Sequence, residues 1–529
     1  MPWSRRNLLA AGAAAGLYAA NGAHAQAPKR GGTLRAIVNP EPPGLIMGLN
    51  QLLPTLEVAG KIYQSLLRYS FDLKPTPCLA RSWTISPDGR VYTFALEPNV
   101  KWHDGEPFTA DDVVYSTTEF LKETHARWRA MYDRCASIKA IDAHTVEFTL
   151  KEPFGAFIFA FSASGCPMMP KHVYAGKGDL RANPANDTPI GTGPFKLAEW
   201  QRGSFIHLVR HADYWAPGKP YLDDIFYYII PDGAQRVAAL ESGRVDMAQY
   251  NDIEFFELPR LRKLPQLTYT TQGSEAISPI SWLDVNLRLP KFQDKRIRKA
   301  MMHAIDRQFI IDNLWFGLGR IAQGPIASTT RFYDESALVK YPYDPARAIA
   351  LLDEMGLKPD AKGVRERVKV LLLPYGEVWN RHAEFVKQSF GKIGLETTIE
   401  TTDTGGFLQR NANWDFELCF NFLSQFMEPA LGVARTYVSS NIRKGIISSN
   451  VTGYSNPVVD DLFARASVQT DEAAAQKLYS EVQHIISDEV PEIYLTELAF
   501  PVFINKAFKD VNVDGTGPAG DFEAAYKET

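Results

Sequence analysis

The sequence lacks the features that mark several classes of protein. Only four cysteines occur in 529 residues, and none has C-x-x-C spacing, which argues against a zinc knuckle or a redox motif. The chain contains no G-x-S-x-G elbow, no H-E-x-x-H and no Walker loop, so common hydrolase and nucleotide-binding patterns are missing. Its ten histidines are scattered and suggest no metal triad. We therefore predict no catalytic residue, no metal site and no cofactor.

Strong charge and long apolar runs are missing too. The formal charge is −4, or about −6 without Arg5 and Arg6 of the presumed export segment. Such mild acidity gives no reason to expect nucleic acid or an anionic membrane surface as a partner. No run of about 18 apolar residues follows the N-terminal segment, so we expect a soluble mature chain without direct membrane insertion.

The N-terminal segment has the three parts of an export signal. Ser4-Arg5-Arg6-Asn7-Leu8-Leu9 resembles a twin-arginine motif, Leu8 to Ala20 is an uncharged run, and Ala23-His24-Ala25 fits a signal peptidase. We interpret residues 1–25 as a twin-arginine signal peptide, with an uncleaved N-terminal helix as the alternative. No cysteine follows the uncharged run, so no lipid anchor is expected. The periplasm is the expected location, and its oxidising conditions permit disulfides.

Four cysteines allow three disulfide pairings, which the sequence leaves open. Cys419 lies in the strand-like run 416–422, where we expect a small buried hydrophobic residue. The other cysteines are Cys78, Cys135 and Cys166.

Strand-like and helix-like segments alternate along the chain, which predicts an α/β fold. Residues 33–38 form an expected first strand. Apolar residues from Ala59 to Leu67 recur at i, i+3, i+4, i+7 and i+8, which predicts an amphipathic helix. From about residue 70 to 191 short alternating strands and turns predominate, which indicates an inserted β-rich subdomain. Farther on, Asp344-Pro345 predicts a helix N-terminus and Gly356 its end.

The stretch 79–116 contains a turn and a helix cap with clear physical causes. Pro87-Asp88-Gly89 predicts a tight turn, because proline presets φ and glycine accepts positive φ. Thr109 precedes a helix whose first turn carries Asp111 and Asp112, which favours capping. The amino-acid sequence of this stretch closely resembles the signature of the family-5 extracellular solute-binding proteins, which are the peptide, nickel and opine receptors of ABC importers.

Further stretches of the chain resemble the same family in order and spacing. They include 191–195, 199–200, 214–215, 220–223, 239–246, 298–300, 304–307, 454–457 and 459–460. The resemblance implies a two-lobed periplasmic binding protein fold of the large type II class, with an extra β-rich subdomain in lobe I. It also implies two extended crossings between the lobes, near 282–286 and 492–498.

The resemblance implies a division of the mature chain into two lobes. Lobe I is expected from three parts, 26–69, 195–281 and 495–529, together with its β-rich subdomain at 70–194. Lobe II is expected at 282–494. The implied function is that of a monomeric periplasmic receptor that captures a peptide-like or other small polar solute by hinge closure. It would deliver that solute to an inner-membrane ABC permease complex.

The loop 421–429 is the best candidate for ligand recognition. Peptide-binding members of the family place an aspartate in this loop, which pairs with the α-ammonium group of the ligand. Here the aligned positions carry Ser424 and Gln425, which are neutral, with Phe422 nearby. Glu428 precedes a proline and could cap the next segment instead. This pattern disfavours a zwitterionic peptide and fits a neutral hydrogen-bonding ligand, such as a sugar or a modified peptide, at least as well.

Five further residues are candidates for the ligand site, each with a structural alternative. Trp282 could stack on a ligand or belong to the core. Glu497, near Tyr494 on the second expected crossing, could face the ligand or form an interdomain salt bridge. Glu41 could reach the cleft or be a solvated loop charge. Arg435 could neutralise a ligand carboxylate or form a structural ion pair.

Three other functions can be weighed against the same sequence. A secreted hydrolase lacks a recognisable motif, and Gly317 to Ala322, although it matches G-x-G-x-x-A, follows a helix rather than a strand. A receptor for a metal chelate or an oligosaccharide stays open, because a chelated metal needs no histidine cluster. A periplasmic chaperone or sensory partner would share the same fold.

Overall fold

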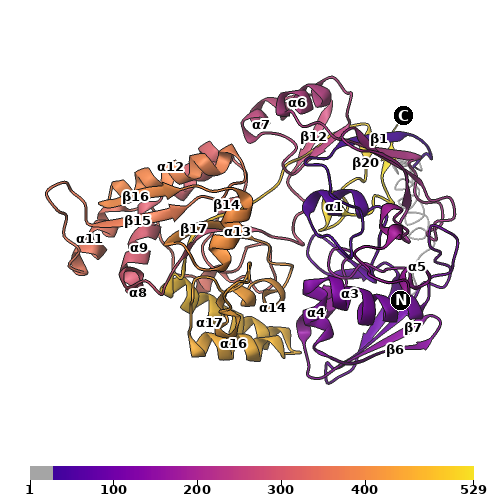
Figure 1. Ribbon diagram of the computed structural model, residues 1–529, viewed down its shortest axis with the longest axis horizontal. Helices are drawn as coiled ribbons and strands as arrows, with labels where there is room; N and C mark the ends of the chain where they lie inside the picture. Colours follow the sequence, from indigo (N-terminus) through magenta and orange to yellow (C-terminus); the bar gives the residue numbers. More distant parts are fainter. Residues whose placement is uncertain (1–27, 529) are drawn as a thin grey trace, which may run out of the picture.

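Two lobes, joined by two short segments, make up the computed structural model, which describes residues 28–528. The expected export segment therefore lies outside the described residues. We call the part of the chain built on the seven-stranded sheet, within residues 28–270 and 502–528, lobe I, and the part built on the six-stranded sheet, within residues 280–497, lobe II; they lie side by side along the longest axis (Figure 1). Residues 271–279 and 498–501 connect the lobes, and we call them the joining segments. Within residues 28–528, every helix is too short or too polar to cross a bilayer.

Lobe I is built on a seven-stranded mixed sheet. Strand β1 pairs in parallel with both β10 and β11, whereas the outer pairs are antiparallel. In spatial order the strands are β12 (Leu267–Thr270), β19 (Val502–Asn505), β11 (Met247–Gln249), β1 (Thr33–Ile37), β10 (Asp224–Tyr228), β9 (Phe205–Arg210) and β8 (Phe195–Gln201). Strand β19, which follows all of lobe II in the sequence, thus lies inside the sheet.

A four-stranded antiparallel sheet forms a separate layer of lobe I, within the range 70–194 of the expected β-rich subdomain. Its strands, in spatial order, are β4 (Ala80–Ile85), β5 (Val91–Leu96), β7 (Thr145–Leu150) and β6 (Cys135–Asp142). Phe94 and Phe148 alternate with half-buried residues along β5 and β7 and meet edge to face. Trp128 of α4 (Ala126–Tyr132) packs on Phe148 and anchors that helix to the sheet.

Lobe II has a six-stranded mixed sheet. In spatial order its strands are β14 (Arg320–Ile321), β18 (Glu492–Glu497), β13 (Ile280–Val285), β17 (Leu418–Leu423), β15 (Glu366–Leu371) and β16 (Leu395–Glu400). Strands β13 and β18 are buried throughout, as expected for central strands covered by helices on both faces. The expected lobe boundaries at 281/282 and 494/495 fall inside these two strands.

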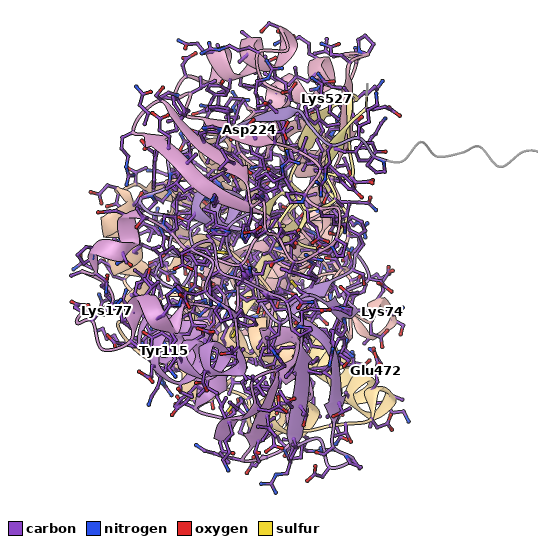
Figure 2. The ribbon with its side chains drawn as sticks, turned by 90° about the vertical axis from the view of Figure 1, so that its right-hand side faces the viewer. Lys74, Tyr115, Lys177, Asp224, Glu472 and Lys527 are labelled. Carbon is purple, nitrogen blue, oxygen red and sulfur yellow. The ribbon has the colours of Figure 1, made fainter. Side chains whose placement is uncertain are left out.

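The helices of lobe I are short. They are α1 (Leu53–Ala59), α2 (Ala110–Tyr115), α3 (Leu121–Thr124), α4, α5 (Lys171–Tyr174), α6 (Gly233–Glu241) and α7 (Leu258–Leu261). Small two-stranded pairs are formed by β2 (Leu67–Tyr69) with β3 (Pro75–Pro77) and by β20 (Phe508–Lys509) with β21 (Tyr526–Lys527). Seen from the lobe I side, Lys527 lies at the same end as Asp224 of β10, while Tyr115 lies lower down (Figure 2).

Lobe II carries the longer helices. They are α8 (Pro290–Gln293), α9 (Lys295–Ala304), α10 (Arg307–Phe309), α11 (Pro345–Glu354), α12 (Glu377–Gly391), α13 (Thr404–Ala412), α14 (Pro429–Gly432), α15 (Ala434–Tyr437), α16 (Pro457–Ser467) and α17 (Glu472–Glu489). The turn between α16 and α17 approaches the four-stranded sheet of lobe I, since a Cβ added to Gly89 would lie 2.6 Å from Thr470 Cγ2 (Figure 1).

The amphipathic helix expected over residues 59–67 is wrong. Helix α1 ends at Ala59, and although the N–H groups of residues 61–63 still donate to Val58 and Ala59, the carbonyl groups of the segment accept from distant parts of the chain. Gly193 N donates to Ile62 O at 2.9 Å, and Ala80 N donates to Leu66 O at 3.0 Å. The apolar spacing was misleading because this segment is buried on all sides, so no polar face exists to define a helical period.

Other local predictions are confirmed. Gly89 has φ 69° in the expected turn, and the Thr109 N–H donates to Asp112 in a capping box. Asp344 caps α11 by accepting from Arg347 N at 2.9 Å. All four cysteines are free thiols, and Cys419 is fully buried in the core of lobe II.

Candidate functional site

The loop after β17 brings lobe II against the first joining segment. We call residues 424–428 the site loop. Gln425 N donates to Ile277 O at 2.7 Å, and nearby the hydroxyls of Ser278 and Thr329 lie 2.8 Å apart. The loop also reaches lobe I, because Met427 packs with residues of its core. The candidate site is therefore where both lobes and a joining segment meet.

The backbone of the site loop is strained. Phe426 and Met427 have φ values of 51° and 69°, in the left-handed region that costs a non-glycine residue about 1–2 kcal/mol. Gln425 holds this conformation: its Oε1 accepts from Ala327 N at 2.7 Å, and its Nε2 donates to Pro325 O at 2.7 Å. The Gln425 amide, 3% exposed, is thus already engaged within lobe II.

Glu428 ends the site loop and caps α14, as the sequence suggested. Its Oε2 accepts from Ala430 N at 2.6 Å, and Tyr479 Oη donates to its Oε1 at 3.2 Å. Burial raises the pKa of Glu428 to about 7, against the opposing hydrogen bond from Ala430 and the charge of Arg331.

Two arginines, one from each lobe, meet at the ring of Phe426. The Arg127 guanidinium carbon lies 4.2 Å from the ring centroid, and that of Arg435 lies 5.3 Å from it. Arg127 follows His125, the N-cap of α4, and precedes the buried Trp128, which fixes the helix. Arg435 lies in α15 of lobe II.

Both arginines keep most of their hydrogen-bonding capacity. Arg127 donates to Gln51 Oε1 at 3.1 Å and to Ser164 O at 2.6 Å. Arg435 donates to Gly432 O at 3.0 Å and to Ser424 O at 2.8 Å. A guanidinium has five N–H donors. No carboxylate among residues 28–528 forms an ion pair with either group, so the positive charges are held by neutral oxygens alone.

Burial and mutual repulsion disfavour the two charges. Burial, followed by the charge of Arg435, lowers the pKa of Arg127 to about 10, and burial lowers the pKa of Arg435 to about 10. Both side chains nevertheless stay protonated at neutral pH. The site therefore concentrates positive charge where the lobes meet.

Glu497 lies beside the joining segments rather than at Phe426. Its carboxylate accepts from Ser328 N at 3.0 Å and from Ser328 Oγ at 2.6 Å. Burial raises the pKa of Glu497, against these bonds and the charge of Arg320. It lines a cavity of about 300 Å³ formed by both joining segments and by residues 317–320. We call this space the hinge cavity.

The remaining sequence candidates have other neighbours. Trp282 is 3% exposed and donates from its indole to Asp284 at 2.7 Å, and Tyr494 is 1% exposed with its hydroxyl 2.9 Å from that of Tyr437. Both have the contacts of core residues of lobe II. Phe422 stacks on Trp379 with ring centroids 5.7 Å apart.

Glu41 is tied to the β8–β9 hairpin. Its carboxylate accepts from the Trp200 indole at 2.9 Å and from Gly203 N at 3.1 Å, and Arg202 lies 3.7 Å away. These contacts are those of a structural loop residue.

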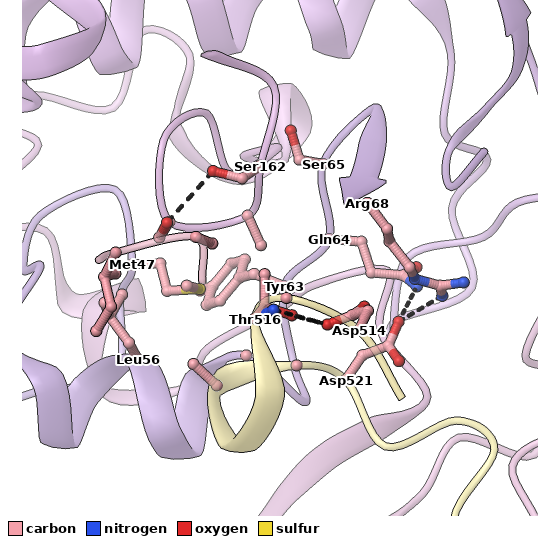
Figure 3. Close-up of a pocket in the computed structure, with 18 of the residues that line it drawn as sticks. Met47, Leu56, Tyr63, Gln64, Ser65, Arg68, Ser162, Asp514, Thr516 and Asp521 are labelled. Carbon is pink, nitrogen blue, oxygen red and sulfur yellow. Dashed lines mark hydrogen bonds and ion pairs between the residues drawn. The ribbon is translucent and has the colours of Figure 1, made fainter. Parts of the chain in front are cut away.

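A small cavity lies in lobe I under the candidate site (Figure 3). Met47, Leu56 and Tyr63 line it, and Ser164 and Ile277 connect it with the surroundings of the arginines. Its volume of about 60 Å³ holds only a few water molecules, whereas solute pockets usually span about 300–1,000 Å³.

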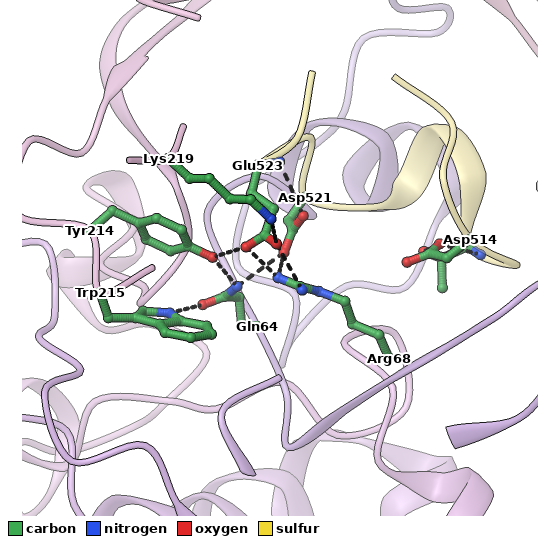
Figure 4. Close-up of polar contacts among 9 residues, drawn as sticks. Gln64, Arg68, Tyr214, Trp215, Lys219, Asp514, Asp521 and Glu523 are labelled. Carbon is green, nitrogen blue, oxygen red and sulfur yellow. Dashed lines mark hydrogen bonds and ion pairs between the residues drawn. The ribbon is translucent and has the colours of Figure 1, made fainter. Parts of the chain in front are cut away.

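A network of charged and polar groups closes the far side of that cavity (Figure 4). Its members are Gln64, Arg68, Tyr214, Trp215, Lys219, Asp521 and Glu523. Burial alone would raise the pKa of Glu523, but the charge of Arg68 and bonds from Arg68, Lys219 and Tyr214 lower it to about 2. Because its charges are mutually satisfied, the network secures the C-terminal segment to lobe I.

The sequence pattern missed Arg127 and Phe426. Arg127 lies far from the loop in sequence, and only the packing of α4 on the four-stranded sheet brings it to the site. Phe426 was within the expected loop, but its aromatic contact with two arginines depends on the left-handed backbone.

The comparisons identify the family of this two-lobed architecture. The model of the bacterial extracellular solute-binding proteins, family 5 Middle, matches residues 74–444, well over half of the chain. The chain belongs to this family. It is a non-catalytic, periplasmic substrate-binding protein of the ABC-importer type, as the resemblance implied.

Individual relatives of this family-5 protein cover most of its length. Di/tripeptide-binding protein 1 of Pseudomonas aeruginosa is 28% identical over 441 residues, 79% of this chain and 80% of the relative. Heme-binding protein A of Haemophilus influenzae is 28% identical over 469 residues, 82% and 81% of the two chains. The structure of the periplasmic binding protein DppA from Helicobacter pylori, in complex with the peptide STSA, superposes with a TM-score of 0.78 at 26% identity, covering 95% of this chain and 99% of that one.

Proposed function

We propose that the protein captures a small polar solute, peptide-like or related, between its lobes and delivers it to an inner-membrane ABC permease as a monomer. The single observation that carries the proposal is the meeting of both lobes at the site loop, next to two short joining segments. Relatives that bind di- and tripeptides and a structural neighbour with a bound peptide support this solute class. A heme-binding relative keeps a chelate receptor as the alternative in the same role.

The proposed site consists of the site loop with its neighbours. Ser424, Gln425 and Arg435 belong to it directly, and Phe422 and Glu497 flank it. We assign Trp282, Tyr494 and Glu41 to its supporting frame, because their polar groups are bonded within the protein. For the lobes we propose boundaries at the joining segments.

Hinge closure is tested by solution scattering and thermal unfolding with a panel of peptides, oligosaccharides, opines and metal chelates. A bound solute should increase the free energy of unfolding by RT ln(1 + [L]/Kd) and thereby raise the melting temperature. It should also decrease the radius of gyration. Binding without any change in dimensions, or turnover of the solute at stoichiometric protein, would contradict the proposal.

We also propose that the twin-arginine motif directs export of the folded chain. Replacing Arg5 and Arg6 with lysine should retain the protein inside the cell, as measured by fractionation. A single change of the exposed Lys74 to arginine serves as the control, and normal secretion of the double variant would exclude this route.

A further inference from the structure

Two arginines from different lobes share the ring of Phe426. Some buried cationic side chains of this protein pair with carboxylates, as Arg68 and Lys219 do with Glu523 in lobe I, and others, such as Arg298 and Arg307, donate from both Nη atoms to carbonyl oxygens. Arg127 and Arg435 have no carboxylate partner among the described residues, although each loses solvation and repels the other. The site thus carries a local excess of positive charge that the protein itself leaves uncompensated.

The free donors of both arginines are accessible. Each guanidinium uses its Nε and Nη2 atoms on neutral oxygens, and its Nη1 has no hydrogen-bond partner among residues 28–528. Both arginines are half-buried residues, so their side chains are not sealed inside the protein. The bonds to Gln51 and Ser424 orient the two planar groups, which favours bidentate recognition of an oxyanion.

The nearby carboxylates offer little to a ligand ammonium group. Glu428 is buried against Ala430 and Tyr479, and Glu497 is bonded to Ser328. In the lobe I cavity, Asp514 accepts from Thr516 N at 2.9 Å and from the Thr516 hydroxyl. Gln425, which stands where peptide receptors of the family place an aspartate, is neutral and fully engaged.

From these contacts we infer that the solute is an organic anion whose carboxylate, or an equivalent oxyanion, is bound by Arg127 from lobe I and Arg435 from lobe II. This assignment rests on the proposed receptor function and adds the charge class of the solute. Because one arginine comes from each lobe, the anion bridges them and removes their repulsion only when the lobes meet. Electrostatic neutralisation thereby stabilises the closed form, and a net negative solute is preferred over a zwitterion of the same shape.

A charge-matched solute set tests the inference on the mature protein. The probes are alanyl-alanine, its N-acetyl acid, its amide and its N-acetyl amide, the corresponding trialanine set, and glutarate beside glutaramide. Affinity is measured by calorimetry and dimensions by scattering. We expect the N-acetyl acids and glutarate to bind with higher affinity than the zwitterions and the amides. A set in which the zwitterions or amides bind best, or in which no anion binds, overturns the inference.

Arginine variants locate the effect. R127Q and R435Q should each weaken binding of the best anion about tenfold to a hundredfold, the loss expected for charge-assisted hydrogen bonds. R127K and R435K should recover part of the lost affinity. They replace the glutamine variants in the test if those unfold. R331Q is the matched control, because Arg331 also stacks on a phenylalanine of the other lobe, Phe159, at 4.6 Å but is paired with Glu472 at 3.0 Å. R331Q should therefore have the same effect on the affinity for charged probes as on the affinity for neutral probes.

The outcomes separate this inference from the receptor function. If an amide or zwitterion binds and compacts the protein while R127Q and R435Q leave its affinity unchanged, the receptor function stands and the anion assignment fails. If an anion binds through both arginines without any change in dimensions, the anion assignment stands and hinge closure fails.

Discussion

At the scale of single residues, Glu428 combines a structural role with an unusual charge state. Its carboxyl group caps α14 and accepts from Tyr479, in a place that excludes water. The proline after it made a capping role predictable from the sequence. Its raised pKa was not predictable, because burial comes from α17, which is distant in the chain.

The raised pKa makes stability depend on pH. The pKa of Glu428 rises from 4.5 to about 7 on folding. The contribution of Glu428 to the free energy of unfolding is therefore fully present below pH 4.5 and is lost as the pH rises through 7. E428Q cannot ionise, and its amide can still accept from Ala430 N and donate to the Tyr479 oxygen. Relative to the parent, the variant should gain roughly 3 kcal/mol of unfolding free energy between pH 4.5 and 8.

Denaturant titrations across this pH range measure the effect. E384Q, at a largely exposed position of α12, is the control and should follow the parent curve. Parallel curves for E428Q and the parent would mean that Glu428 is ionised in the folded protein without penalty.

Single residues also show how far the sequence can predict this site. Gln425 and Ser424 were recognisable because they replace an aspartate of a known pattern, and both lie where the lobes meet. Trp282 and Glu41 were chosen from residue type and position alone, and their partners Asp284 and Trp200 were not foreseeable. Chemistry suggests which side chains could bind a solute, but only packing decides which are already occupied.

At the scale of elements, α14 and the site loop depend on a close backbone approach. A Cβ at Gly432 would lie 2.0 Å from Gln425 O, so the helix fits against the loop only because this residue has no side chain. The loop itself contains two left-handed residues, whose cost must be offset by such packing and by the bonds of Gln425.

We expect G432A to destabilise lobe II and to displace the site loop. Overpacking of this kind costs about 1–3 kcal/mol, which corresponds to a decrease in melting temperature of several degrees for a lobe of this size. G405A is the matched control, since a Cβ in α13 would have only Asp403 nearby, at 3.8 Å, and should be neutral or slightly stabilising. Differential scanning calorimetry decides the question. Equal melting temperatures for the two variants would contradict the close approach.

Elements were predictable where local chemistry specifies them. Thr109 with Asp112 and Asp344 with Pro345 carry their caps in neighbouring residues, and both helices begin as expected. The segment 59–67 failed, because its backbone is bonded to Gly193 and Ala80, which no local pattern reveals. Similarly, the strand-like run 416–422 corresponds to a strand at Leu418–Leu423, since its bounds are set by pairing with β13.

At the scale of the whole molecule, the lobes touch at several places besides the joining segments. The site loop meets Arg127, Arg331 stacks on Phe159, and Thr470 lies against Gly89. The family resemblance predicted two lobes with an inserted subdomain, but these contacts depend on side chains that vary within one fold. They define a conformation that a covalent link can trap.

A disulfide between positions 89 and 470 should lock the lobes together. A Cβ at position 89 would lie 2.6 Å from Thr470 Cγ2, which places the two Cβ atoms near the 3.5–4.5 Å that a disulfide needs. The left-handed φ of 69° at Gly89 costs a cysteine about 1–2 kcal/mol, which the cross-link can outweigh. Oxidised G89C/T470C should exchange solute slowly and keep one radius of gyration with or without it.

Reduction of the double variant should restore exchange, and the single variants G89C and T470C should behave like the parent under both conditions. Fast exchange in the fully oxidised variant, verified by mass spectrometry, would show that solute passes without separation of lobe II from the four-stranded sheet.

The position of β19 inside the lobe I sheet has a consequence for the order in which the chain is synthesised. Among residues 28–528, strand β12 has β19 as its only neighbour in that sheet, and β19 is synthesised after all of lobe II. The ribosome therefore synthesises every strand of lobe II before it synthesises β19, the strand that completes the sheet of lobe I. A prematurely terminated product would keep an intact lobe II but present an open strand edge, a feature prone to aggregation and readily attacked by proteases.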